Sequence, residues 1–370
     1  MNRKQFIKSS LVAGSAGALI ATGCGDTAKS GDITAPNINL NKITRWRMVT
    51  TWPPNFPVVG EGCNLLSQWV KDMSAGRLEI QVYGGGELVP ALEVFDAVSS
   101  GAVEMGHGAA YYWAGIEPAF QFFTSVPFGM NAQQMNAWME SGGGHALWKE
   151  VYERFNLYPL YAGNTGLQMG GWFNKRIDRL SDFRGLKMRM PGLGGKVLEK
   201  VGGTAVLSPG SELYTNLERG VIDATEWIGP YHDYLMGFHD IAKYYYYPGW
   251  HETGSVLELI INKRDYESLA PDLKAILEAA SYRSNAYMLA EFESKNNQYL
   301  KKINEESDAE LLQFPSEVLR ELRAVTMDIY QDLIDNDPLS KRVYDSFWSF
   351  KKDITEWSRL SEQVFYNDIQ

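Results

Sequence analysis

The stretch RWRMVTT at residues 45–51 alternates apolar and polar side chains, which is the pattern of a half-buried β-strand. Residues 63–73 then carry apolar side chains at helical spacing, and residues 78–83 alternate again before Gly84-Gly85-Gly86. A strand, a helix and a second strand in this order predict a β-α-β unit. We therefore expect folded structure from about Ile43 onwards, of the α/β class.

Residues 92–98 extend this unit as a helix, which leads through Gly101 into a short predicted strand at residues 102–105. Residues 213–224 repeat the same order around Gly220, and the stretches AVSSGAVE and NLERGVID align without a gap. In both, a helix is expected to end at a glycine with positive φ, before a short strand carrying an acid. Two explanations stay open: an internal duplication, or a turn that recurs in α/β proteins.

The chain has 370 residues, 45% of them hydrophobic, which suffices for a large core and about two lobes. A long helix is expected over residues 273–300, with Pro271 near its start, where the missing N–H costs least. Two more predicted helices, residues 316–334 and 338–366, close the chain and carry several aromatic side chains. They either pack onto the lobes or form a contact in a homodimer. The expected architecture is two α/β lobes with a crevice between them.

The N-terminus has the features of an export signal. Arg3, Lys4 and Lys8 precede an apolar stretch at residues 10–21, which is too short to stay as a span of a bilayer roughly 30 Å thick. Residues 3–8 also resemble a twin-arginine (Tat) signal, with Lys4 in place of the second arginine. Export by the Sec route or by the Tat route therefore stays open.

Small residues follow the apolar stretch directly before Cys24, which resembles a bacterial lipoprotein site. Ordinary cleavage nearby, with an incidental cysteine, is the alternative. We expect a signal peptide at residues 1–23 and a flexible tether at residues 24–42, where Gly, Ser, Thr, Asn and Pro predominate. If Cys24 is lipidated, Cys63 has no partner for an internal disulfide, because the chain has only two cysteines.

Charge and composition exclude several classes of function. A net charge of -10 argues against nucleic acid, whose phosphates need a basic surface. The five histidines include no pair at zinc-ligand spacing with a general base between them. No Gly-x-Ser-x-Gly elbow and no phosphate-binding loop occur, so hydrolytic and nucleotide-binding functions are disfavoured.

The stretch LKMRM at residues 186–190 alternates with period two, which places Lys187 and Arg189 on one face of a strand. Pro191-Gly192 ends that strand, and a helix opens around Gly194. Arg189 is therefore expected near the carboxyl end of a strand, where ligands bind in open α/β sheets. A guanidinium matches a carboxylate with two parallel hydrogen bonds. An ordinary ion pair is the alternative role for such an arginine.

Three other segments are candidates to meet Arg189 in the crevice. Residues 164–172 place amide side chains among glycines, where backbone can approach a ligand closely. Residues 224–230 and 247–252 each combine an acid and a tryptophan with a Gly/Pro turn. Aromatic walls with few polar groups are typical of small-molecule pockets. Taken one by one, the aromatic residues are better explained by core packing and the acids by solvated loops.

The motifs GNTGLQMGGWF, GLKMR, IDATEWIGPY and YYYYPGW, between Gly163 and Thr253, closely resemble the solute-binding proteins of tripartite ATP-independent periplasmic (TRAP) transporters. Within that family, the chain is most similar to the branch that binds 2-oxo acids. GELVP, FDAV and YYW, between residues 86 and 113, belong to the same resemblance. It covers about Ile43 to the C-terminus, whereas the signal, the tether and the last helices match only loosely.

The resemblance implies a two-lobed periplasmic binding protein that closes over its ligand and serves a membrane complex driven by an ion gradient. Lobe I would comprise residues 43–165 and about 255–310, including the long connecting helix. Lobe II would comprise residues 166–254, and residues 311–370 would form C-terminal helices. The ligand would be a small monocarboxylate, a 2-oxo acid such as pyruvate or a short homologue.

The resemblance also assigns residues. Arg189 would grip the carboxylate, while Gln168, Glu226 and the backbone carbonyl of Trp227 would bind a metal cation that bridges to the acid. Glu252 is added to the cation ligands, although His251 stands where another aromatic residue is frequent. Asn164 and Tyr112 are candidate neighbours in the substrate pocket, together with Gln168 and Trp227.

Elementary electrostatics supports a cation without the resemblance. One or two buried carboxylates beside an anionic ligand would repel it, and Arg189 alone cannot neutralise that cluster. Oxygen ligands of amide, carbonyl and carboxylate type suit sodium or calcium and not zinc. We expect sodium first and calcium as the other candidate.

The residues offer neither an activated nucleophile nor a convincing acid–base pair, so we expect a binding protein and not an enzyme. The alternative is an exported enzyme acting on small organic acids, with Glu226 or His251 as general base. A third hypothesis is a sensor lipoprotein that uses the same pair of lobes.

Overall fold

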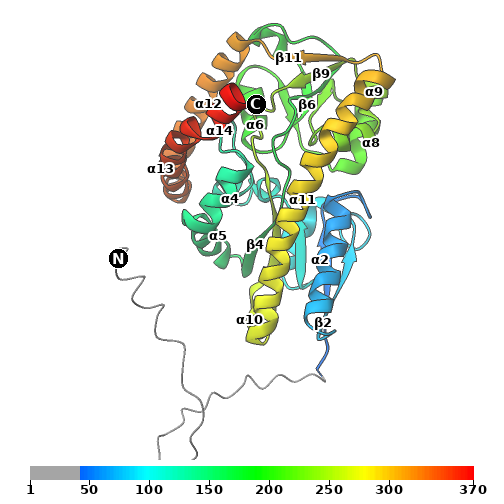
Figure 1. The fold of residues 1–370 in the computed structure, drawn as a ribbon, viewed down its shortest axis with the longest axis vertical. Helices are drawn as coiled ribbons and strands as arrows, with labels where there is room; N and C mark the ends of the chain where they lie inside the picture. Colours follow the sequence, from blue (N-terminus) through cyan, green and yellow to red (C-terminus); the bar gives the residue numbers. More distant parts are fainter. Residues whose placement is uncertain (1–41) are drawn as a thin grey trace, which may run out of the picture. The chain divides into compact units, whose positions relative to one another are not determined.

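The computed structural model describes residues 42–370. The predicted signal peptide, the lipidation site at Cys24 and the tether up to residue 41 lie outside the described residues. Within residues 42–370, no helix combines the length and the apolar character needed to cross a membrane. The predicted α/β class is confirmed, because two sheets are surrounded by helices (Figure 1).

The first sheet has the strand order β2-β1-β3-β10-β4. Its strands are β1 (Thr44–Thr50), β2 (Leu78–Tyr83), β3 (Met105–Gly108), β4 (Leu157–Asn164) and β10 (Val256–Asn262). β1 runs parallel to β2 and β3, and helix α2 (Val59–Met73) connects β1 to β2. The predicted β-α-β unit is therefore confirmed. β10 runs antiparallel to its two neighbours and is buried along its whole length.

The second sheet has the order β11-β9-β5-β8-β6-β7. Its strands are β5 (Gly171–Phe173), β6 (Lys187–Arg189), β7 (Thr204–Val206), β8 (Ala224–Thr225), β9 (Tyr244–Tyr247) and β11 (Glu310–Gln313). β6 lies parallel to both β7 and β8. Helix α6 (Gly192–Lys200) begins directly after Pro191, so the predicted strand that ends at proline and feeds a helix is present.

The two aligned stretches form matching units. Helices α3 (Val94–Ser99) and α7 (Leu213–Glu218) are followed by Gly101 and Gly220, with φ of 79° and 66°, and then by β3 and β8. The triplets β2-β1-β3 and β7-β6-β8 have the same order and direction.

The acids of these units also correspond, since Glu104 accepts a hydrogen bond of 2.8 Å from the Arg47 backbone N–H and Asp223 one of 2.8 Å from the Lys187 backbone N–H. This shared geometry favours a duplication. The predicted strand at residues 102–105 is wrong in its start, because β3 begins only at Met105. Before it, the Glu104 side chain takes the N–H that a strand residue would otherwise engage.

The long predicted helix is present as α11 (Pro271–Glu306), with proline at its first position. α11 packs on β4 of the first sheet and on α2, and also on α8 (Pro230–Leu235), which follows β8 of the second sheet (Figure 1). Two further helices follow, α12 (Ser316–Asn336) and α13 (Pro338–Leu360). The prediction of one helix to residue 366 is corrected, because α13 ends at Leu360. Ser361 interrupts the helix before the short α14 (Glu362–Val364).

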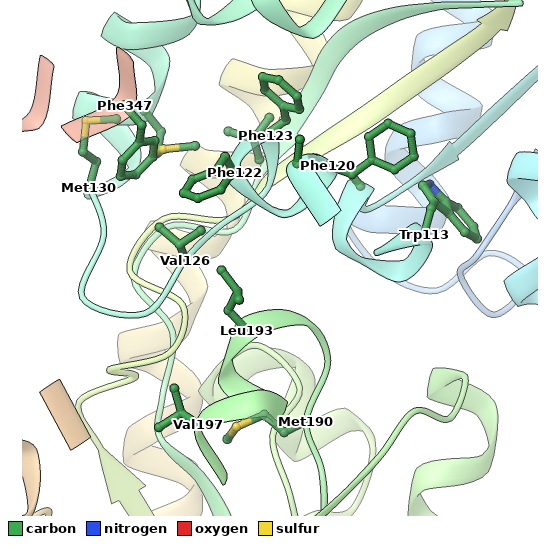
Figure 2. Close-up of a cluster of buried hydrophobic side chains, with 14 of the residues drawn as sticks. Trp113, Phe120, Phe122, Phe123, Val126, Met130, Met190, Leu193, Val197 and Phe347 are labelled. Carbon is green, nitrogen blue, oxygen red and sulfur yellow. The ribbon is translucent and has the colours of Figure 1, made fainter. Parts of the chain in front are cut away.

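Buried side chains join the helices around the two sheets. One cluster includes Phe120 and Phe122, from a short helix at Pro118–Phe123, together with Phe347 of α13. Leu193 and Val197 of α6 belong to the same cluster, and Leu193 points toward Val126 (Figure 2). Apolar packing thus holds the start of α6 in place, directly after the strand that ends in Arg189.

Candidate functional site

Arg189 is the last residue of β6, and only 1% of it is exposed. Its Nη1 contacts Oε1 of Glu226, which follows β8, the strand beside β6. Its Nη2 donates to the hydroxyl of Tyr112 at 3.3 Å, and its Nε donates to the Ser208 carbonyl at 3.4 Å. Burial opposes the charge of Arg189, but the anionic Glu226 outweighs it, and the guanidinium pKa is raised. Arg189 is thus charged and fixed in direction.

These contacts use three of the five N–H groups of the guanidinium. One N–H on Nη1 and one on Nη2 remain. A guanidinium that keeps one N–H on each of its two Nη atoms can donate two parallel hydrogen bonds to a carboxylate. The arginine is therefore able to bind an organic acid while it keeps its contact with Glu226.

Aromatic rings enclose the guanidinium. Its Cζ atom lies 5.4 Å from the ring centroid of Trp227 and 6.0 Å from that of Tyr112. Trp52 packs against both rings, with centroids 6.3 Å from Trp227 and 6.5 Å from Tyr112. Buried rings exclude water, and a charge-assisted hydrogen bond is stronger in such surroundings.

Gln168 and Glu252 form the second part of the site. The Gln168 side chain lies between β4 and β5 and donates to Glu252 Oε2 at 2.8 Å and to Thr165 Oγ1 at 3.0 Å. The same Glu252 oxygen accepts from Ser255 Oγ at 2.5 Å and from the Tyr111 hydroxyl at 3.4 Å. One oxygen of Glu252 is thus held by three donors, while the other stays available.

Three buried oxygens of this region have no hydrogen-bond partner among the described residues: Oε1 of Gln168, Oε2 of Glu226 and Oε1 of Glu252. A buried acceptor without a donor is costly, and a cation within reach would satisfy it. Ligand atoms of Glu226, His251 and Glu252 lie within 4.8 Å of one another. The donor set therefore fits a metal ion held mainly by oxygen.

His251 is the unexpected member of this group. Its Nε2 lies 3.5 Å from Glu226 Oε2, which is too long for a good hydrogen bond, and neither ring nitrogen has a partner in the described structure. The imidazole is 2% exposed. It therefore adds a nitrogen ligand, or a hydrogen-bond donor, beside the oxygen atoms.

Negative charge accumulates here beyond what Arg189 neutralises. Burial, followed by the charge of Glu226, raises the pKa of Glu252 to about 7. The hydrogen bond from Ser255 and the charges of His251 and Arg189 act in the opposite direction. A cation next to Glu226 and Glu252 would relieve their repulsion and favour the ionised form of both.

Asn164 is less directly involved. It ends β4, its Oδ1 accepts a 2.9 Å hydrogen bond from the Gly166 backbone, and its Nδ2 has no partner within the described region. No hydrogen bond in residues 42–370 joins it to Arg189 or Glu226. The structure thus groups Arg189, Tyr112, Glu226 and Trp227, joins Gln168 to Glu252, and leaves Asn164 apart.

Sequence reasoning missed Tyr111, Ser208 and Ser255. Ser255 carries a recognisable signal, because a hydroxyl placed shortly after Glu252 in a turn can reach its carboxylate. Tyr111 precedes the predicted Tyr112 but points to the other acid. Ser208 acts through its backbone carbonyl, which leaves no trace in the side-chain pattern.

A family model for bacterial extracellular solute-binding proteins of family 7 matches residues 48–337. The chain is also 38% identical, over 368 residues, to the monocarboxylate 2-oxoacid-binding periplasmic protein of Nostoc sp. (strain PCC 7120). That match covers 99% of this chain and 98% of the relative.

Two solved structures of TRAP periplasmic solute-binding proteins are similar in sequence and fold. The protein from Pseudoalteromonas atlantica, solved with bound sodium and pyruvate, is 39% identical with a TM-score of 0.87, over 89% of this chain and 100% of that one. The protein from Colwellia psychrerythraea, solved with bound calcium and pyruvate, is 39% identical with a TM-score of 0.86, over 88% and 100%.

Proposed function

Because the chain belongs to the family 7 extracellular solute-binding proteins, and within it to those of TRAP transporters, we propose that it carries a short 2-oxo monocarboxylate such as pyruvate. The acid would bind together with a metal cation and be passed to the membrane subunits of the transporter. The observation that carries this proposal is the buried Arg189 with two free N–H groups, beside oxygens that lack donors.

Each residue of the site has a defined part in this proposal. Arg189 binds the carboxylate through its two free N–H groups, while Tyr112 and Ser208 fix the plane of the guanidinium. Trp227 covers the guanidinium and limits the volume open to the acid's carbon chain. Asn164 is kept as an outer neighbour whose free Nδ2 faces buried surroundings.

The cation would be held by Gln168, Glu226, Glu252 and the backbone carbonyl of Trp227. Its charge offsets the two carboxylates, so that an anionic ligand can enter the cluster. The ligand oxygens suit sodium and calcium, and the two similar proteins were solved with one or the other beside pyruvate. We favour sodium and keep calcium as the alternative.

The state of the two candidate bases supports binding without turnover. Glu226 is engaged with Arg189, and His251 has no partner that would fix its tautomer. An enzyme would need one of them within reach of a reacting proton. Product formation on incubation with pyruvate, lactate and longer homologues would favour the enzyme alternative, and binding without an associated transporter would favour the sensor.

Each proposed lobe is built around one of the two sheets. Lobe I would hold the first sheet, and lobe II the second sheet up to β9, with α11 alongside both. Tyr112 follows β3 of the first sheet, whereas Arg189 ends β6 of the second. The hydrogen bond between these two residues therefore links the lobes, and closure over the acid would bring them together.

The C-terminal helices would form a homodimer contact. Trp357 and Leu360 at the end of α13 are 64% and 76% exposed, and Phe365, Tyr366 and Ile369 beyond it are exposed as well. Large apolar side chains gathered on one terminal segment are typical of an interaction surface. A second copy of the same chain is the partner we propose for it.

Export and anchoring are proposed from the N-terminal sequence alone. Cleavage before Cys24 and lipidation of its thiol would tether the protein to the outer face of a membrane. Mass spectrometry of the mature protein tests this, because a diacylglyceryl group on Cys24 supports the proposal and an unmodified N-terminus elsewhere refutes it.

Calorimetry is the test of the ligand. Pyruvate should bind saturably to the purified protein in sodium or calcium and should not be consumed. A panel of short 2-oxo and 2-hydroxy acids then sets the preferred chain length. Absence of binding across the panel, with each cation supplied, would refute the proposed function.

A further inference from the structure

A separate pocket of about 460 Å³ lies between helices α12 and α13 and the segments at residues 128–129, 167–168 and 248–250, together with Thr253. We call it the basic pocket. Leu319, Arg320 and Arg323 line it from α12, and Lys351 lines it from α13. α12 packs on α6 near the second sheet, whereas α13 packs on α4 (Ala132–Ser141) and α5 (Gly144–Glu153). The pocket is therefore lined by elements that pack on different parts of the molecule.

Its inner wall is apolar and fixed. The rings of Phe128 and Trp250 stack with centroids 5.8 Å apart, and the Phe128 N–H donates to the Trp250 carbonyl at 2.8 Å. Phe128 has a φ of 53°, a left-handed conformation that is costly for a bulky side chain. Such strain persists only where surrounding contacts enforce it, and it is found often at ligand-binding sites.

Three cationic side chains meet this wall. The guanidinium of Arg323 lies 4.9 Å from the ring centroid of Phe128, and the ammonium group of Lys351 donates to the Phe128 carbonyl. Arg320 lines the pocket beside Arg323. Phe128 therefore carries a cation over its ring and another at its backbone.

No acidic side chain of residues 42–370 forms an ion pair with any of these three cations. Burial and the nearby charge of Arg323 lower the pKa of Lys351 to about 8. The pocket thus brings together three cations that repel one another and have no ion-pair partner in the described chain; the side chains of Arg320 and Arg323 are exposed, and that of Lys351 is half-buried. An anion placed among Arg320, Arg323 and Lys351 would remove this repulsion and accept charge-assisted hydrogen bonds.

We propose that the basic pocket is a second binding site, for an organic anion with a short apolar body. The carboxylate would lie against Arg323 and Lys351, and the apolar body would pack on Phe128, Trp250 and Leu319. The size of the pocket suits a small molecule, and its wall combines aromatic surface with few polar groups, as ligand sites do.

This site is distinct from the one around Arg189, although it uses the reverse side of the same segments. Gln168 lines the basic pocket, while its side chain donates to Glu252 in the first site. The Gly249 N–H donates to the Gln168 carbonyl at 3.0 Å, and this backbone contact lies between the basic pocket and the first site. Arg189 and Glu226 do not line the basic pocket. The proposal therefore does not depend on which acid the first site binds.

The test is isothermal titration of benzoate, which has a carboxylate and a compact apolar body. Two protein samples prevent benzoate from binding at the first site and serve as hosts for the titration. One is the Arg189→Ala variant, and the other is the wild-type protein saturated with pyruvate and its cation. We expect one equivalent of benzoate to bind in both hosts. Benzamide, with the same shape and no charge, should not bind.

The double variant Arg323→Gln/Lys351→Gln should weaken benzoate binding roughly tenfold or more, because it removes two charged donors. Lys352→Gln, the exposed neighbour on α13, is the matched control and should bind benzoate as the wild type does. Retained pyruvate binding by the double variant would show that it is folded. No benzoate binding in either host, equal binding by the double variant, or equal binding of benzamide would overturn the proposal.

Discussion

Glu226 contacts Arg189 through one carboxylate oxygen, while its other oxygen is buried without a hydrogen-bond donor among the described residues. The same side chain therefore neutralises the guanidinium and offers a ligand to a cation. Removal of its charge weakens both tasks, because the amide of a glutamine keeps an oxygen but neither neutralises the guanidinium nor attracts the ion as a carboxylate does.

We expect Glu226→Gln to weaken the cation dependence of pyruvate binding. In the wild type, affinity should fall strongly after sodium removal and chelation. In the variant, affinity with the cation should approach affinity without it, since one buried negative charge is gone. Titration of pyruvate at several sodium and calcium concentrations measures this. The exposed Glu305→Gln serves as the control, and an unchanged cation dependence in Glu226→Gln would remove Glu226 from the cation site.

Tyr112→Phe should weaken pyruvate binding by about 0.5–1.5 kcal/mol, the usual contribution of a single hydrogen bond. The ring that packs on Trp52 would remain, and only the hydroxyl that orients Arg189 would be lost. Dissociation constants from calorimetry provide the comparison. Tyr111→Phe removes a hydroxyl that bonds to Glu252 and should alter the cation dependence more than Tyr112→Phe does.

Stability should depend on pH through Glu258, which is buried away from the site. Its oxygens accept hydrogen bonds of 2.5 Å from Trp113 and 2.8 Å from Tyr152, but burial raises its pKa from 4.5 to about 7. Between these pH values the native protein keeps a proton that the unfolded chain has released. The contribution of Glu258 to the free energy of unfolding therefore falls as pH rises, by at most ~3 kcal/mol.

Glu258→Gln should remove that contribution, because its amide stays neutral at every pH. The difference in the free energy of unfolding between variant and wild type, from urea unfolding at pH 4.5 to 8, should shift in favour of the variant as pH rises. Taking this difference cancels other buried groups, including His107, whose lowered pKa of about 4 has the opposite effect. A difference that does not change with pH would contradict the assigned cause.

The proposed dimer gives a fourth prediction. Leu360→Glu places a charge on the most exposed large apolar side chain of α13 and should convert a dimer to a monomer in analytical ultracentrifugation. Leu88→Glu is the control, because Leu88 is 44% exposed and lies far away in the sequence. Equal sedimentation of Leu360→Glu and wild type would place the contact elsewhere or exclude it.

Local pattern predicted much of the fold. We identified β1 and β2 from the alternation at residues 45–51 and 78–83, and most of α2 from the helical spacing at residues 63–73. A strand or helix that buries one face repeats its apolar residues with the period of that element. The start of β3 was placed too early, since the turn before it depends on a tertiary contact of Glu104. The end of α13 at Ser361 was likewise not predicted, because no proline or glycine stands there in the sequence.

The candidate site was predicted in part. Arg189 was identified from its place at the carboxyl end of a predicted strand, and the resemblance supplied Gln168, Glu226 and Glu252. The structure brings all four residues into one buried region. Sequence could not show that Glu226 pairs directly with Arg189. That contact arises only because β6 and β8 lie side by side, which requires the whole second sheet.

The sequence suggested His251 as an alternative general base and as the replacement of a frequent aromatic residue, but did not predict that it lies beside Glu226 and Glu252. Its place among the oxygens comes from the connection between β9 and β10, whose path no local pattern describes. The same holds for Tyr111, which is distant from Glu252 in the sequence, whereas Ser255 lies only three residues after Glu252 and could have been found from that spacing.

Pyruvate calorimetry on Arg189→Ala tests the central claim most directly. Truncation leaves Glu226 uncompensated and removes the carboxylate's two donors, so affinity should fall by roughly 2–5 kcal/mol. Arg189→Lys keeps the charge but not the planar fork and should also bind more weakly. Exposed Arg184→Ala should bind normally, and near-UV circular dichroism should confirm that each variant is folded. Near-native affinity in folded Arg189→Ala would contradict the account.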